Sequence, residues 1–126
     1  MQRMETPEPP GARLLVAKDA ESNVELYSGD QLDVALDGNP TTGYVWELAS
    51  VNRRVLLPAG KPAYRPASDA IGSGGVFTFS FGAVKPGQTV LRLVYRRPWE
   101  KRKRPIATFR VGVVVKQAPG APHGAA

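Results

Sequence analysis

Cysteine is absent from this chain of 126 residues. Its absence excludes disulfide bonds, thiolate metal sites and cysteine nucleophiles. Histidine occurs once, as His123, in a terminal stretch of proline, glycine and alanine. A catalytic base must be held in place by neighbouring groups, and a metal site needs several converging ligands. We therefore expect a protein that is not an enzyme and that has no metal site or cofactor.

Long apolar stretches are also missing. No run of about 18 apolar residues could cross a bilayer, so we expect no membrane partner. Residues 1–11 hold acids and prolines where a signal peptide would have its apolar segment. The compartment stays unknown: we expect a periplasmic or secreted protein if a signal peptide has been removed, and a cytoplasmic one otherwise.

Positive charge is concentrated in one segment. The net charge is +6, and residues 96–104 hold six lysines and arginines against one glutamate. One hypothesis is therefore a basic module that binds nucleic acid or another anionic surface through residues 96–104. However, no row of aromatic residues accompanies this segment along a strand, as single-strand binders require. We expect no nucleic acid partner.

Short stretches with strand-like alternation fill most of the chain, and glycine and proline separate them. Leu32, Val34 and Leu36 alternate with polar residues, and Phe77, Phe79 and Phe81 do the same further along. Seven or eight such stretches without an amphipathic helix predict an all-β sandwich or barrel. We assign one domain to residues 12–116, between flexible tails at 1–11 and 117–126. Residues 61–70 show no periodicity, and we interpret them as a crossing segment.

Three connections between these stretches have unusual contents. They are Asn39-Pro40-Thr41-Thr42-Gly43-Tyr44, then Gly72-Ser73-Gly74-Gly75 directly after Ile71, and finally Arg97-Pro98-Trp99. Proline and β-branched threonines restrict the backbone, whereas glycine permits a positive φ and the close approach of a partner. Loops that hold one shape bind at a low entropic cost. We expect them to form one composite binding surface, whereas a sandwich used only for adhesion or assembly predicts loops that do not converge.

The two tryptophans have different expected roles. Trp46 alternates in phase with Tyr44 and Leu48, which predicts a side chain in the core. Trp99 follows a proline among basic residues, which favours an exposed anchor. The glycine-rich loop at 72–75 lacks the lysine and the following helix of a phosphate-binding loop, so nucleotide binding is not expected.

The three motifs, in this order, resemble the chagasin family of cysteine protease inhibitors. The resemblance runs from about residue 23 to residue 116, nearly the whole ordered domain. It implies an immunoglobulin-like β-sandwich that acts as a reversible, tight-binding inhibitor of papain-like or cathepsin L-like cysteine proteases. We expect such an inhibitor to be a monomer.

The resemblance also implies a role for each loop. Thr41 and Thr42 would lie over the cysteine and histidine of the protease, within a wedge that spans residues 39–44. The loop at 72–75 would follow the non-primed side of the cleft, with Ile71 near the apolar specificity pocket. The primed side would be held by Arg97, Pro98 and Trp99. The basic run at 100–104 departs from the family pattern.

Overall fold

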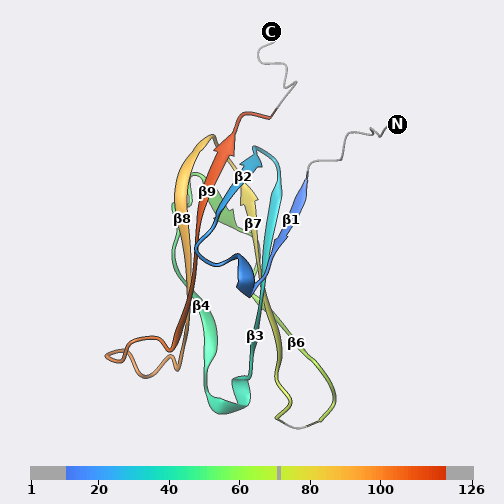
Figure 1. Ribbon diagram of the computed structural model, residues 1–126, viewed down its shortest axis with the longest axis vertical. Helices are drawn as coiled ribbons and strands as arrows, with labels where there is room; N and C mark the ends of the chain where they lie inside the picture. Colours follow the sequence, from blue (N-terminus) through green and yellow to red (C-terminus); the bar gives the residue numbers. More distant parts are fainter. Residues whose placement is uncertain (1–10, 71, 119–126) are drawn as a thin grey trace.

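The computed structural model describes residues 11–70 and 72–118, which fold into two β-sheets (Figure 1). Within this part of the chain the strands are β1 (Ala12–Leu15), β2 (Asn23–Tyr27), β3 (Gln31–Gly38), β4 (Val45–Ser50), β5 (Leu56–Pro58), β6 (Ala63–Pro66), β7 (Gly75–Ala83), β8 (Gly87–Arg96) and β9 (Ala107–Lys116). Two single-turn 3-10 helices, η1 (Ala17–Asp19) and η2 (Pro40–Thr42), are the helical elements of the described residues. Neither is long and apolar enough to span a membrane.

The first sheet has five strands: β1, β3 and β7 lie in this order, and β5 and β6 follow one another along the other edge of β7. The second has four, in the order β2-β9-β8-β4. β1 runs parallel to β3 and β2 parallel to β9, whereas the remaining pairs are antiparallel. The all-β sandwich expected from the sequence is confirmed.

The core lies between the sheets, and strand alternation places its side chains. In the antiparallel register of β3 and β7, Leu32, Val34 and Leu36 pair with Phe81, Phe79 and Phe77. All six are at most 7% exposed. From the second sheet come Leu91, Leu93, Phe109, Val111, Val113 and Val115, each at most 2% exposed. Burying one such side chain contributes about 1.5–3 kcal/mol, so this cluster holds the sheets together.

β6 is a strand that we did not expect. All four of its residues are exposed, and it pairs with β7 alone. An edge strand with no buried face lacks the alternation that reveals other strands, which explains the missed assignment. It has a structural role nonetheless, because the ring of Tyr64 packs against Phe77 with centroids 4.9 Å apart.

Trp46, expected in the core, packs against it as a partly buried side chain. Its indole Nε1 donates a hydrogen bond to the carbonyl of Asp37, 2.9 Å away, and so connects β4 to the end of β3. The β3–β4, β6–β7 and β8–β9 connections all leave the sandwich at one end (Figure 1). The described chain begins and ends at the opposite end (Figure 1).

Candidate functional site

The β3–β4 loop, residues 39–44, is a capped single turn of 3-10 helix. Asn39 Oδ1 accepts hydrogen bonds from the Thr41 backbone N–H (3.1 Å) and the Thr41 hydroxyl (2.6 Å). Pro40 begins the turn, and Gly43 ends it at φ +88° with its N–H bonded to the Pro40 carbonyl. Asparagine at the cap, proline at the first position and a left-handed glycine at the end are the residues that such a turn favours. The local sequence therefore specifies this conformation.

The tip of this loop is exposed but internally bonded. Thr41 and Thr42 are both exposed to solvent. The Thr42 hydroxyl donates to the Asn39 carbonyl, 2.7 Å away, while the Thr41 hydroxyl donates to the Asn39 side chain. Because both threonines are held by bonds within the loop, their outer surfaces are presented in one conformation.

Asn39 also joins this loop to the β6–β7 loop, residues 67–74. Its Nδ2 donates to the carbonyl of Gly72 at 2.9 Å. Gly74, at φ +81°, lies so close that a Cβ there would be 3.2 Å from the carbonyl oxygen of Gly38. An open depression of about 390 Å³ lies between the two loops, with Ser73 and Tyr95 among its lining residues. Ile71, the proposed apolar contact, lies outside the described residues.

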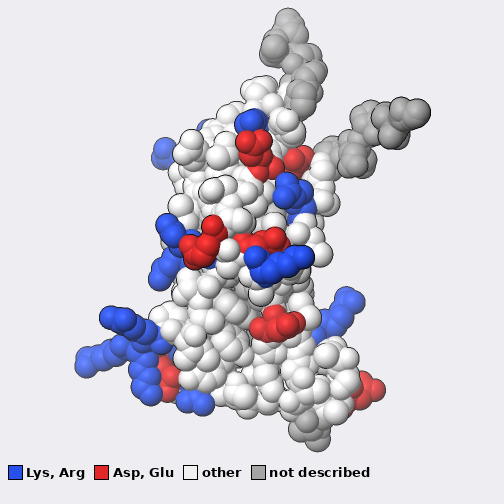
Figure 2. Space-filling model, in the orientation of Figure 1, with Lys and Arg blue, Asp and Glu red and all other residues white. Residues whose placement is uncertain are grey.

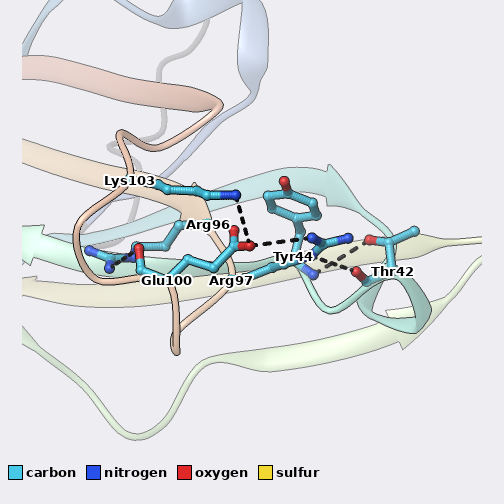
Figure 3. A network of polar contacts seen from close by, with 6 residues as sticks. All are labelled: Thr42, Tyr44, Arg96, Arg97, Glu100 and Lys103. Atoms are coloured by element: carbon cyan, nitrogen blue, oxygen red, sulfur yellow. Dashed lines mark hydrogen bonds and ion pairs between the residues drawn. The ribbon is translucent and has the colours of Figure 1, made fainter.

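Arg97 joins the β3–β4 loop to the β8–β9 loop, residues 97–106 (Figure 3). Its Nε donates to the Thr42 carbonyl at 3.1 Å, and its guanidinium carbon lies 4.6 Å from the centroid of the Tyr44 ring. Trp99 lies against the same loop, since a Cβ on Gly43 would be 2.6 Å from the indole Cη2. Even so, Trp99 is 67% exposed, as the sequence led us to expect of an anchor.

Glu100 holds the base of the β8–β9 loop (Figure 3). Its carboxylate Oε2 lies 3.4 Å from Arg97 Nη1 and 3.3 Å from Lys103 Nζ. Its carbonyl accepts a hydrogen bond from Arg96 Nη2 at 3.1 Å. One acidic residue therefore neutralises and orients cations on both of its sides, including the arginine that contacts the β3–β4 loop.

Tyr95 is a contributor to the site that the sequence analysis missed. Its hydroxyl accepts the backbone N–H of Asn39 at 2.9 Å. Its ring packs between Tyr44 and Trp46, with centroid distances of 5.5 and 5.0 Å. The register of β4 against β8 places Tyr95 opposite Trp46, and this register cannot be obtained from either strand alone.

The described candidate residues thus meet at one end of the fold, with Asn39 and Arg97 as the bonded junctions between loops. A sandwich used only for adhesion or assembly predicted loops that do not converge, and this prediction is wrong. Within residues 11–70 and 72–118, no group of three or more His, Cys, Asp or Glu side chains could hold a metal ion. The β6–β7 and β8–β9 loops are each bonded to the β3–β4 loop, which lies between them.

Comparisons with known proteins show relatives of this chain. Amoebiasin-2 of Entamoeba histolytica is 27% identical over 104 residues, which make up 82% of this chain and 85% of the relative. The crystal structure of the cysteine protease inhibitor EhICP2 from Entamoeba histolytica is similar in fold, with a TM-score of 0.76 at 24% identity over 84% of this chain and 96% of that one. PbICP-C, whose structure was solved in complex with falcipain-2, shares the fold with a TM-score of 0.56 at 18% identity over 83% and 98% of the two chains.

A match to a family model shows to which family the chain belongs. The model of the chagasin family of peptidase inhibitors matches residues 25–113. This range includes all three of the loops described above and most of both sheets. The chain therefore belongs to the chagasin family of peptidase inhibitors.

Proposed function

We propose that this protein is a reversible, tight-binding inhibitor of papain-like cysteine proteases and that its β3–β4 loop enters their active-site cleft. The observation that carries the proposal is the bonded convergence of three loops at one end of the sandwich, through Asn39 to Gly72 and Arg97 to Thr42. Membership of an inhibitor family supports it, as does the similarity to EhICP2, which is named a cysteine protease inhibitor. PbICP-C in its complex with falcipain-2 shows a protein of this fold with a bound partner.

The β3–β4 loop has the properties of a wedge that resists cleavage. The carbonyl of Asn39 accepts bonds from Thr42, the carbonyl of Pro40 accepts the N–H of Gly43, and the carbonyl of Thr42 accepts Nε of Arg97. Nucleophilic attack requires a carbonyl that is aligned about 3–3.5 Å from the nucleophile. Because these carbonyls already accept hydrogen bonds, two from within the turn and one from Arg97, they are not presented as an extended substrate presents them. Thr41 and Thr42 would then cover the catalytic cysteine and histidine without being consumed.

The other two loops would hold the inhibitor on either side of the wedge. Residues 72–75 would follow the non-primed side, with Ile71 near the apolar specificity pocket. The primed side would be bound by Arg97, Pro98 and Trp99, and the exposed indole of Trp99 is of the type that dominates interface energies. Since the loops are bonded to one another before docking, little conformational entropy remains to be lost on binding. We propose that the protein acts as a monomer and catalyses no reaction itself.

An inhibition titration tests this function. Increasing amounts of the protein are added to papain and to a cathepsin L-like protease, each with a known concentration of active sites. We expect stoichiometric loss of activity, recovery after large dilution, and an inhibitor that mass spectrometry finds uncut. Absence of inhibition at micromolar concentration across several papain-like proteases would refute the proposal, and steady cleavage of the protein would reclassify it as a substrate.

A further inference from the structure

The β8–β9 loop carries a cationic surface that the contacts among the three loops do not use. Its four successive basic residues, Lys101 to Arg104, are all exposed. Exposed apolar side chains lie near both ends of the run: Trp99 is 67% exposed and Ile106 is 61% exposed. Figure 2 shows the resulting gathering of basic side chains where this loop projects from the sandwich.

Glu100 divides the cations of this segment into those that it contacts and those that face solvent without an ion pair. It pairs with Arg97 and Lys103, and its carbonyl binds Arg96. In contrast, Lys101, Arg102 and Arg104 make no ion pair within the described part of the chain. We define these three residues, with Trp99 and Ile106, as the basic docking surface.

The loop that presents this surface is closed by hydrogen bonds at several points. Glu100 N–H donates to the Arg97 carbonyl, and Lys103 N–H donates to the Glu100 carbonyl, so two turns follow each other. Ile106 N–H donates to the Tyr95 carbonyl at 3.0 Å and closes the base. A loop held in this way displays its charges at a defined position beside Trp99, unlike a solvated tail.

We infer that the basic docking surface recognises an acidic rim on the target protease, next to the active-site cleft. This inference rests on the proposed function, because a protease seated on the β3–β4 loop would also meet the loop that Arg97 bonds to it. Charges at the rim of an interface act mainly on the association rate. Trp99 and Ile106 would then make the short-range apolar contact, which favours a protein partner over a nucleic acid backbone.

Two variants with equal loss of charge test the inference. The first replaces the outward cations: Lys101→Gln, Arg102→Gln and Arg104→Gln. The matched control replaces three exposed cations at the opposite end of the sandwich, near the turn between β7 and β8: Arg53→Gln, Arg54→Gln and Lys85→Gln. Arg97, Lys103 and Glu100 stay intact in both, so the bonded loops are unaltered. Association and dissociation rates are measured by stopped flow with two papain-like proteases, one acidic and one basic by isoelectric focusing.

With the acidic protease at roughly 20 mM salt, we expect the first variant to associate about tenfold more slowly and the control less than about twofold more slowly. At roughly 0.5 M salt the difference should nearly vanish, with dissociation rates unchanged throughout. If the association rate fell equally in both variants, or if salt did not reduce the difference, the inference would be overturned although the protein still inhibits the protease. The inference would also be overturned if the unaltered protein bound duplex DNA in a gel shift and the first variant lost this binding while its association rate with the protease stayed unchanged. If the unaltered protein inhibits neither protease, the proposed function fails first.

Discussion

Arg97 Nε donates a hydrogen bond to the main-chain carbonyl of Thr42, 3.1 Å away, although 55 residues separate them in the chain. The bond joins the β8–β9 loop to the exposed tip of the β3–β4 loop. The same guanidinium lies over the ring of Tyr44 and pairs with Glu100. Arg97 therefore has two roles, as a contact residue of the proposed interface and as the residue that holds the wedge in its conformation.

Arg97→Ala should weaken inhibition by about 2 kcal/mol, or roughly thirtyfold in the inhibition constant. The change removes the bond to Thr42 and the cation above Tyr44. The inhibition constant of Arg97→Lys should lie between those of the unaltered protein and Arg97→Ala, because a lysine keeps the charge but cannot reproduce the planar guanidinium. Inhibition constants against papain check this, with Arg92→Ala on the exposed face of β8 as the control. An Arg97→Ala variant as potent as the Arg92→Ala variant would contradict the assigned role.

Substitutions of Asn39 can distinguish its two roles, the cap of the turn through Oδ1 and the bond to the β6–β7 loop through Nδ2. Asn39→Ser keeps an oxygen that can cap the turn but loses the Nδ2 donor to Gly72. We expect the stability of this variant to change little. Its dissociation from the protease should be about fivefold faster, which corresponds to the loss of one ordinary hydrogen bond.

Asn39→Ala removes both functions and should cost about 1 kcal/mol of stability in addition. Urea unfolding measures the stability of both variants, and surface plasmon resonance gives the dissociation rates. If the serine variant dissociates as slowly as the unaltered protein, the bond to Gly72 does not organise the site.

Gly43 and Trp99 should be energetically coupled. Gly43→Ala places a methyl group at φ +88° and 2.6 Å from the indole Cη2 of Trp99. The alanine should therefore destabilise the protein by about 1–3 kcal/mol. In a Trp99→Ala background the contact disappears and only the backbone strain remains, so the cost should be smaller. A double-mutant cycle on unfolding free energies checks this, and strictly additive values would show that the two residues do not touch in solution.

Trp46 should contribute to stability and not to recognition. Trp46→Phe keeps a ring beside Tyr95 but loses the bond from Nε1 to Asp37, for an expected cost of about 1 kcal/mol. The inhibition constant at a temperature where the variant is folded should change little. Urea unfolding followed by circular dichroism measures this cost, because the variant lacks one of the two indole fluorophores of the chain. A large loss of inhibition in stable Trp46→Phe protein would place this residue in the interface instead.

Much of the fold could be predicted because alternation is a local signal. Two strands with one buried face can be predicted before their pairing is known, from the alternation of Leu32, Val34 and Leu36 and from that of Phe77, Phe79 and Phe81. β6 was not predicted, because none of its side chains is buried and its sequence therefore shows no alternation. Alternation does not show where a strand ends: β9 begins at Ala107 and leaves the apolar Ile106 in the exposed loop.

The sequence by itself determined the conformation of the β3–β4 turn, because its cap, its proline and its left-handed glycine lie within the five residues from Asn39 to Gly43. It also determined which strands have a buried face. Only the tertiary structure decided that Asn39 reaches Gly72, that Arg97 reaches Thr42 and that Glu100 divides the basic run. Contacts between loops depend on strand register across long separations, and register is set when the two sheets bury their faces together.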